Sequence, residues 1–159
     1  MDIQVSSNFE RLLFEMNDRD GGMTAEQLQR FRATGRLHVE DDQRTAFLDG
    51  TFLAGRVDDA GTIDVISRTY RDVEMLVDPH TAVAIGTAEL LRSADQLRGP
   101  VVTHATAHPA KFPDAVEQAT GIRPPLPSRL ADLFERDERF DELPNDVAAV
   151  RDHVLAALG

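Results

Sequence analysis

The chain has 159 residues, of which 42% are hydrophobic and 28% charged, as is usual for one globular domain. Its 28 acidic and 17 basic residues give a formal net charge of −11, so no nucleic acid or acidic membrane surface is expected as a partner. The absence of cysteine excludes disulfides, thiolate nucleophiles and cysteine-ligated zinc. The first residues lack the pattern of a signal peptide, and no apolar run reaches the length of a transmembrane helix. The cytoplasm is therefore the expected location.

Helical patterns occupy the first third of the chain. Ser7 and Glu10 have the spacing of a capping box and precede apolar residues at helical spacing. Thr24 is expected to cap a second helix, which Gly35 ends. A third helix is expected over residues 47–53, interrupted by a glycine.

Two aspartates mark the starts of the next helices. Asp58 precedes an apolar face that extends over residues 63–73. Asp78 is a good N-cap, and Pro79 suits the first helical position. The helix they open extends to about Ser93 and is apolar on nearly every side, so we expect it to be buried.

The stretch over residues 101–113 predicts a strand that leads directly into a helix. A β-branched run over 101–106 is the one main strand expected in the chain, and helical spacing follows over 112–119. A lone strand cannot pair its own backbone groups, so its sheet partners are expected outside this chain. The polar side chains at this junction are Thr103, His104, Thr106, His108 and Lys111. The elements expected after it are a proline-rich connector at 124–127, a short helix near 130–134 and a last helix from Pro144.

The histidines permit a metal hypothesis that the spacing does not favour. His104 and His108 are four residues apart, but Pro109 and the preceding strand pattern argue against the single helix that this spacing would need. A metal-dependent hydrolase using both of them with His80 remains a third possibility. Asp78 is either an ordinary helix cap or part of a helix start that points His80 at an anionic ligand.

Three motifs in order give the chain a family resemblance. They read Ser-Ser-Asn-Phe-Glu-Arg-Leu-Leu at 6–13, Asp-Pro-His-Thr-Ala-Val at 78–83 and Ala-Thr-Ala-His-Pro-Ala-Lys-Phe at 105–112. With Leu-Pro-Asn-Asp-Val-Ala-Ala-Val at 143–150, they make the whole chain resemble threonine synthase of the bacterial and fungal branch. The resemblance covers only the C-terminal portion of that family.

The resemblance implies a pyridoxal-phosphate lyase that converts O-phospho-L-homoserine and water into L-threonine and phosphate. It implies an α/β fold of type II, of which residues 1–159 form a single C-terminal segment, mostly helical with one main strand near 101–106. That segment would complete the large cofactor-binding domain, and its partner would be the missing N-terminal portion of the same enzyme. The Schiff-base motif is absent here, and the single lysine, Lys111, does not match it. No catalytic residue is therefore expected in this segment, which should be inactive alone.

The resemblance also assigns candidate site residues. Thr106 matches the hydroxyl residue that meets the pyridine nitrogen of the cofactor, where the protein tunes how well the ring accepts electrons. His80, Thr81, His108 and Lys111 fall in matching motifs and are expected as neighbours of the active site, without individual roles. The alternative is an acidic helical module that binds another protein and has no catalytic function.

Overall fold

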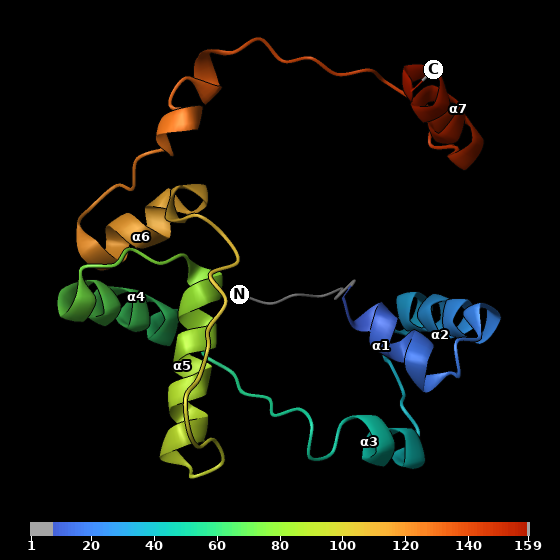
Figure 1. The fold of residues 1–159 in the computed structure, drawn as a ribbon, viewed down its shortest axis with the longest axis horizontal. Helices are drawn as coiled ribbons and strands as arrows, with labels where there is room; N and C mark the ends of the chain where they lie inside the picture. Colours follow the sequence, from blue (N-terminus) through green and yellow to red (C-terminus); the bar gives the residue numbers. More distant parts are fainter. Residues whose placement is uncertain (1–7, 159) are drawn as a thin grey trace. The chain divides into compact units, whose positions relative to one another are not determined.

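The computed structural model describes residues 8–158, which form helices joined by irregular segments (Figure 1). The chain divides into two compact units, residues 1–124 and 125–159. The α-helices are α1 (Phe9–Met16), α2 (Gly21–Thr34), α3 (Asp41–Phe47), α4 (Asp59–Val73), α5 (Pro79–Ser93), α6 (Pro113–Thr120) and α7 (Val147–Leu158). The 3-10 helices are η1 (Pro109–Lys111), η2 (Ser128–Leu130) and η3 (Leu133–Glu135).

The first two helices begin and end for local reasons. The expected Ser7 cap lies outside the described residues, and α1 begins at Phe9. Thr24 does not cap α2, as the sequence pattern had suggested, because the Asp20 carboxylate accepts a bond from the Met23 amide at 2.9 Å. The hydroxyl of Thr24 instead donates to the Asp20 carbonyl oxygen at 2.8 Å. Gly35 ends α2 as predicted, since it adopts a left-handed conformation with φ 70°.

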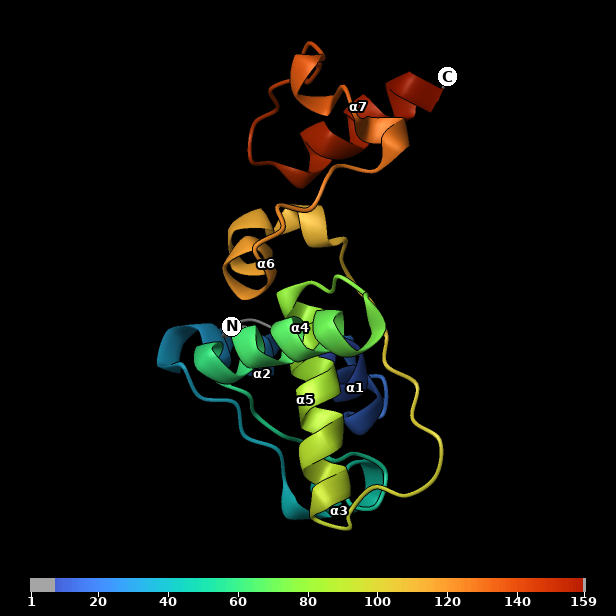
Figure 2. The same ribbon diagram turned by 90° about the vertical axis from the view of Figure 1, so that its left-hand side faces the viewer.

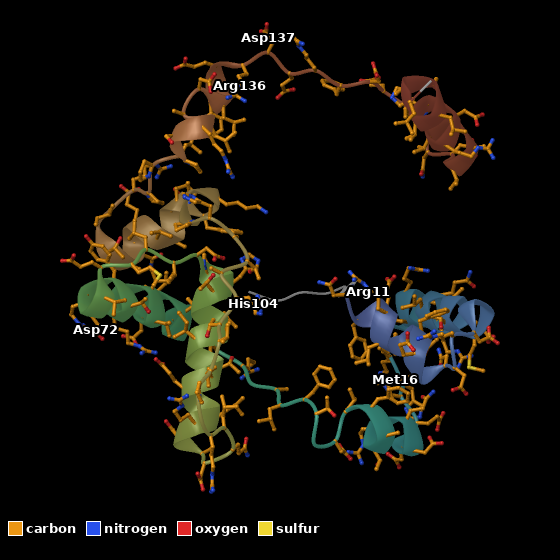
Figure 3. All side chains as sticks on the ribbon, viewed as in Figure 1. Arg11, Met16, Asp72, His104, Arg136 and Asp137 are labelled. Atoms are coloured by element: carbon orange, nitrogen blue, oxygen red, sulfur yellow. The ribbon has the colours of Figure 1, made fainter. Side chains whose placement is uncertain are left out.

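A network of side-chain amides joins the first three helices. Asn17, nearly buried after α1, donates from its amide nitrogen to Thr24 Oγ1 and Gln27 Oε1, each at 3.1 Å. Gln43 of α3 donates to the Met16 carbonyl oxygen at 2.7 Å and to Asn17 Oδ1 at 3.2 Å. Figure 3 marks Met16 at the end of α1. Because an unpaired buried amide is costly, these bonds hold α3 beside the end of α1.

The third helix lies earlier in the chain than expected. A capping box of Glu40 and Gln43 starts α3, which ends at Phe47. Gly50 then adopts a left-handed conformation with φ 77°. The expected helix over 47–53 is therefore wrong, because α3 ends at Phe47 and the other apolar residues in that range follow it.

The largest group of packed helices comprises α4, α5 and α6. Figures 1 and 2 show α4 crossing α5, and α6 also packs on α4. Asp58 caps α4 through a bond from the Gly61 amide at 2.8 Å, and Asp78 caps α5, as the sequence predicts. The core residues are Val65, Ile66, Val77 and Ala82, with Ile85 and Ala119 packed against them.

Helix α5 is buried on one face only. Thr81, Ala82 and Gly86 are buried, but Leu90 is 55% exposed, so the expectation of burial on every side is wrong. Gly86 allows a close approach, since a Cβ built there would lie 3.1 Å from methyl groups of Val57 and Val65. Some apolar side chains of α5 are therefore left uncovered by the described residues.

The main strand expected near 101–106 is not formed. Residues 101–106 are irregular, and the range 8–158 contains no β-strand at all. A strand needs a neighbouring strand to pair its backbone groups, and none of the described segments pairs with this one. The helix expected directly after it is confirmed as α6.

The second unit begins at the proline-rich connector. The expected short helix near 130–134 appears as η2 and η3, and the last helix begins at Val147, with Asp146 accepting a bond from the Ala149 amide at 2.8 Å. The apolar side chains of α7 are exposed, Val147 to 86%. None of the helices in the described part of the chain is long and apolar enough to cross a bilayer.

Candidate functional site

The start of α5 is organised around a buried carboxylate. Asp78 has no exposed surface, and its Oδ1 accepts bonds from the His80 amide and from the His80 ring nitrogen Nδ1, each at 2.9 Å. Its Oδ2 accepts a bond from the Thr81 hydroxyl. Pro79, at the first helical position, needs no partner for a backbone N–H. Three donors from two adjacent residues therefore meet one aspartate.

Asp78 stays ionised although it is buried, because these donors stabilise its carboxylate. Burial by itself acts to raise the pKa of this carboxyl group. The Thr81 hydroxyl and the amide and ring of His80 oppose it, and together they hold the pKa below its ordinary value. Asp78 is therefore an ionised, fully paired acceptor at neutral pH.

The irregular segment after α5 forms one side of a pocket with this helix start. The pocket has a volume of about 690 Å³, within the usual range for small-molecule sites. It is lined by Asp78, Thr81 and Ile85 from the α5 side and by residues between 101 and 109, Thr106 and His108 among them. The structure thus brings together Thr81, Thr106 and His108 of the predicted site residues.

His80 and Lys111 do not line that pocket but meet at Phe112 beside it. The rings of His80 and Phe112 are 4.9 Å apart between centroids and tilted by 54°. Lys111 Nζ lies 5.9 Å from the centroid of the same phenyl ring, within range of a cation–π contact. Phe112 is the residue that sequence reasoning missed, because it ended a motif and began a helical face without being given a place at the site.

Thr106 and His108 differ in what their side chains already bind. His108 caps η1, with its Nδ1 accepting a bond from the Ala110 amide at 3.2 Å. Thr106 is exposed, and its hydroxyl forms no hydrogen bond with any other residue in the range 8–158. A threonine hydroxyl can both donate and accept, so this one is available to a ligand.

The other histidines do not build a metal centre. His104 is exposed and lies on the segment after α5 (Figure 3). Across the described residues, no group of three or more histidine and acidic side chains is placed to hold a metal ion. The arrangement of His80, His104 and His108 needed for the hydrolase hypothesis is therefore not present.

A second pocket, of about 470 Å³, lies between α4 and α5. It contains a paired guanidinium, since Arg68 Nη1 donates to Glu89 Oε1 at 2.8 Å. The bond that Arg68 donates to Glu89 raises the pKa of Arg68 and lowers the pKa of Glu89. Arg68 and Glu89 are thus bound to each other.

Comparison with known proteins shows what the chain is similar to. Residues 81–154 match the family model described as "Threonine synthase, C-terminal". The chain is 49% identical over 95% of its length to threonine synthase of Pseudomonas aeruginosa, and 31% identical over 99% to that of Corynebacterium glutamicum. It spans about a third of the length of these relatives, 32% and 33% respectively.

Solved structures agree with the sequence matches. The crystal structure of PLP-bound threonine synthase from Brucella melitensis is similar with a TM-score of 0.70 and 39% identity, over 97% of this chain and 32% of that one. Threonine synthase from yeast is similar with a TM-score of 0.66 and 29% identity, over 99% of this chain and 35% of that one. The chain is thus similar, over nearly all of its length, to the C-terminal part of threonine synthases.

Proposed function

We propose that this chain is the C-terminal portion of a threonine synthase, and that the whole enzyme converts O-phospho-L-homoserine and water into L-threonine and phosphate with pyridoxal phosphate. The observation that carries the proposal is the free hydroxyl of Thr106 in a pocket shared with the start of α5. Each side of that pocket includes residues of the motifs at 78–83 and 105–112 that carry the resemblance. The relative from Brucella melitensis, which is PLP-bound, supports the choice of cofactor.

The chain would complete the large cofactor-binding domain of a fold type II enzyme. The segment over 101–106 would then pair as a strand with the sheet of the N-terminal portion. Its irregular backbone and the 83% exposure of Val102 support this proposal, since a segment without its sheet has nothing to cover it. The proposed location is the cytoplasm, which suits the acidic composition.

The pocket residues fit one end of the cofactor. Pyridoxal phosphate supplies an electron sink for the substrate's carbon skeleton, and its ring nitrogen sets how strongly that sink acts. Thr106 would hydrogen-bond this nitrogen through its hydroxyl, without the full negative charge that a carboxylate would bring. His80, Thr81, His108 and Lys111 would surround the site. Thr81 already donates its hydroxyl to Asp78, so its part is to fix the helix start.

Neither alternative is favoured. An acidic interaction module without catalysis does not account for a match to enzymes over nearly the whole chain. Such a module would also bind its partner equally well without the Thr106 hydroxyl, and this distinguishes it from the proposed enzyme. A metal-dependent hydrolase would lose activity with a chelator.

The first experiment compares the segment with the full-length enzyme. The isolated chain, mixed with pyridoxal phosphate and O-phospho-L-homoserine, should release no phosphate above the buffer blank, because the segment carrying the Schiff-base lysine is missing. The full-length enzyme should release phosphate and form threonine in equal amounts. Steady turnover by the isolated chain would refute the assignment to a C-terminal portion.

The second experiment changes Thr106 in the full-length enzyme. Thr106→Ser keeps the hydroxyl and should retain most activity. Thr106→Ala removes a hydrogen bond worth roughly 0.5–1.5 kcal/mol and should weaken cofactor binding by up to about tenfold. Thr51→Ala, at an exposed threonine outside the pocket, is the matched control. If the alanine variants at both positions bind and turn over like the parent, Thr106 does not contact the cofactor.

Thr106→Asp tests the electronic part of the proposal. A carboxylate beside the ring nitrogen would stabilise its protonated form. The cofactor's absorbance spectrum in the presence of substrate should therefore change more than its affinity does. An unchanged spectrum with normal affinity would place Thr106 away from the ring nitrogen.

A further inference from the structure

The carboxylate of Asp78 is buried more deeply than capping a helix requires. Asp58 caps α4, a helix of the same 15-residue length as α5, from an exposed position, where its carboxylate accepts a bond from the Gly61 amide. Asp78 has no exposed surface and also binds a ring nitrogen and a hydroxyl. Burying a carboxylate is costly unless its partners are fixed, so the additional contacts of Asp78 need an explanation beyond the cap.

The bond to Asp78 determines which nitrogen of His80 carries the proton. An ionised carboxylate can only accept, so the ring nitrogen Nδ1, at 2.9 Å from Oδ1, must be the donor. In the neutral imidazole the other nitrogen, Nε2, is then unprotonated and acts as an acceptor. The same bond fixes the plane of the ring, because the His80 amide binds the same oxygen.

The fixed ring supports the turn that follows the Thr106 segment. His80 is in contact with Phe112, which ends η1 and immediately precedes α6. The turn 109–111 therefore rests on a ring whose orientation is set from the start of α5. Thr106 lies three residues before this turn, so its place in the pocket depends on where the turn is held.

We propose that Asp78 is a positioning residue, which holds His80 as its Nδ1–H tautomer against Phe112 and so keeps Thr106 in place beside the start of α5. The effect of Asp78 on cofactor binding rests on the function proposed above. The tautomer of His80 can be tested whether or not that function is correct. The role of Asp78 is indirect, because it acts on Thr106 only through His80 and Phe112.

The test uses the full-length enzyme labelled with nitrogen-15 in its histidines. Long-range proton–nitrogen spectra separate protonated from unprotonated ring nitrogens, and the signals that vanish in His80→Gln identify His80. Asp78→Ser keeps a helix-capping side chain but is too short to reach the ring. Asp78→Asn retains an oxygen acceptor of the same reach and serves as the conservative variant. Asp58→Ser makes the matched change at the cap of α4.

The proposal expects Nδ1–H in the parent, in Asp78→Asn and in Asp58→Ser, with contacts between the rings of His80 and Phe112. Asp78→Ser should lose both signatures and bind pyridoxal phosphate up to about tenfold more weakly, the effect of losing one hydrogen bond. Asp58→Ser should change that affinity less than about twofold.

Two results would overturn the proposal. One is a parent in which His80 is mainly the Nε2–H tautomer, a measurement that needs no variant to fold. The other is Asp78→Ser with the parent's tautomer, ring contacts and cofactor affinity. A parent that binds no pyridoxal phosphate would instead refute the proposed function, while the spectra of His80 would still decide the role of Asp78.

Discussion

Replacing Gly86 with alanine tests the close packing of α5 against its neighbours. The added methyl would lie 3.1 Å from a methyl group of Val57 and one of Val65, closer than the 3.5–4.0 Å of an optimal carbon contact. Both neighbours are β-branched and stiff, and Val65 is buried, so neither can turn away freely. Overpacking of this kind costs about 1–3 kcal/mol.

The gain in helix propensity opposes that cost. Alanine is favoured over glycine in a helix interior by about 1 kcal/mol. We therefore expect Gly86→Ala to lower the free energy of unfolding by about 1 kcal/mol, the difference between about 2 from overpacking and about 1 from propensity. Urea unfolding followed by far-ultraviolet circular dichroism measures this change.

A second variant in the same helix calibrates the propensity. Ala84 is exposed on α5, so Ala84→Gly should cost about 1 kcal/mol without any change in packing. If Gly86→Ala raises the free energy of unfolding by as much as Ala84→Gly lowers it, the added methyl is not overpacked. The close approach of Val57 and Val65 to α5 would then be refuted.

Three further predictions concern charge and exposed apolar surface. The pKa of Asp78 is lowered in the folded chain, so its stabilising effect is complete above its ordinary value of 3.8 and is lost as the pH falls further. Lowering the pH should therefore reduce the free energy of unfolding less in Asp78→Asn than in the parent. Equal reductions in the two proteins would contradict a buried, charged Asp78. Arg68→Met should lower the free energy of unfolding by less than about 1 kcal/mol, because the pair with Glu89 is partly exposed. In high salt this loss should become smaller. If urea unfolding shows a loss that salt does not change, the ion pair does not account for it. The isolated chain should self-associate through the exposed segment around Val102, and sedimentation of a strictly monomeric chain would disprove this.

Local signals allowed part of the fold to be predicted. Asp58, Asp78 with Pro79, and Gly35 set helix ends through their own side chains or backbone, and the structure has each of them in that role. Such contacts lie within four residues of one another, so a sequence pattern contains all that determines them. Thr24 failed as a cap because a better acceptor, Asp20, stood four residues earlier.

The remaining errors arise from contacts that a sequence pattern does not contain. The β-branched run over 101–106 has strand propensity, but a strand also needs a paired neighbour, which the described chain does not supply. Leu90 is exposed because the burial of α5 depends on which neighbours reach it. The contact between His80 and Phe112 joins residues 32 positions apart, so spacing alone gave no reason to pair them.

Lys111 makes the edge of the pocket open to selective chemical labelling. It is the single lysine among 159 residues, and its side chain is exposed on η1 beside Phe112. An amine-directed fluorophore would therefore attach to the isolated chain at two kinds of amine, this one and the α-amino terminus, which differ in basicity and can be separated by pH. The dye would lie five residues from Thr106, so its emission could follow the docking of the proposed N-terminal portion without any engineered cysteine. The same chemistry defines a necessary control, because pyridoxal phosphate is itself an amine-reactive aldehyde, and its attachment to Lys111 could be mistaken for cofactor binding.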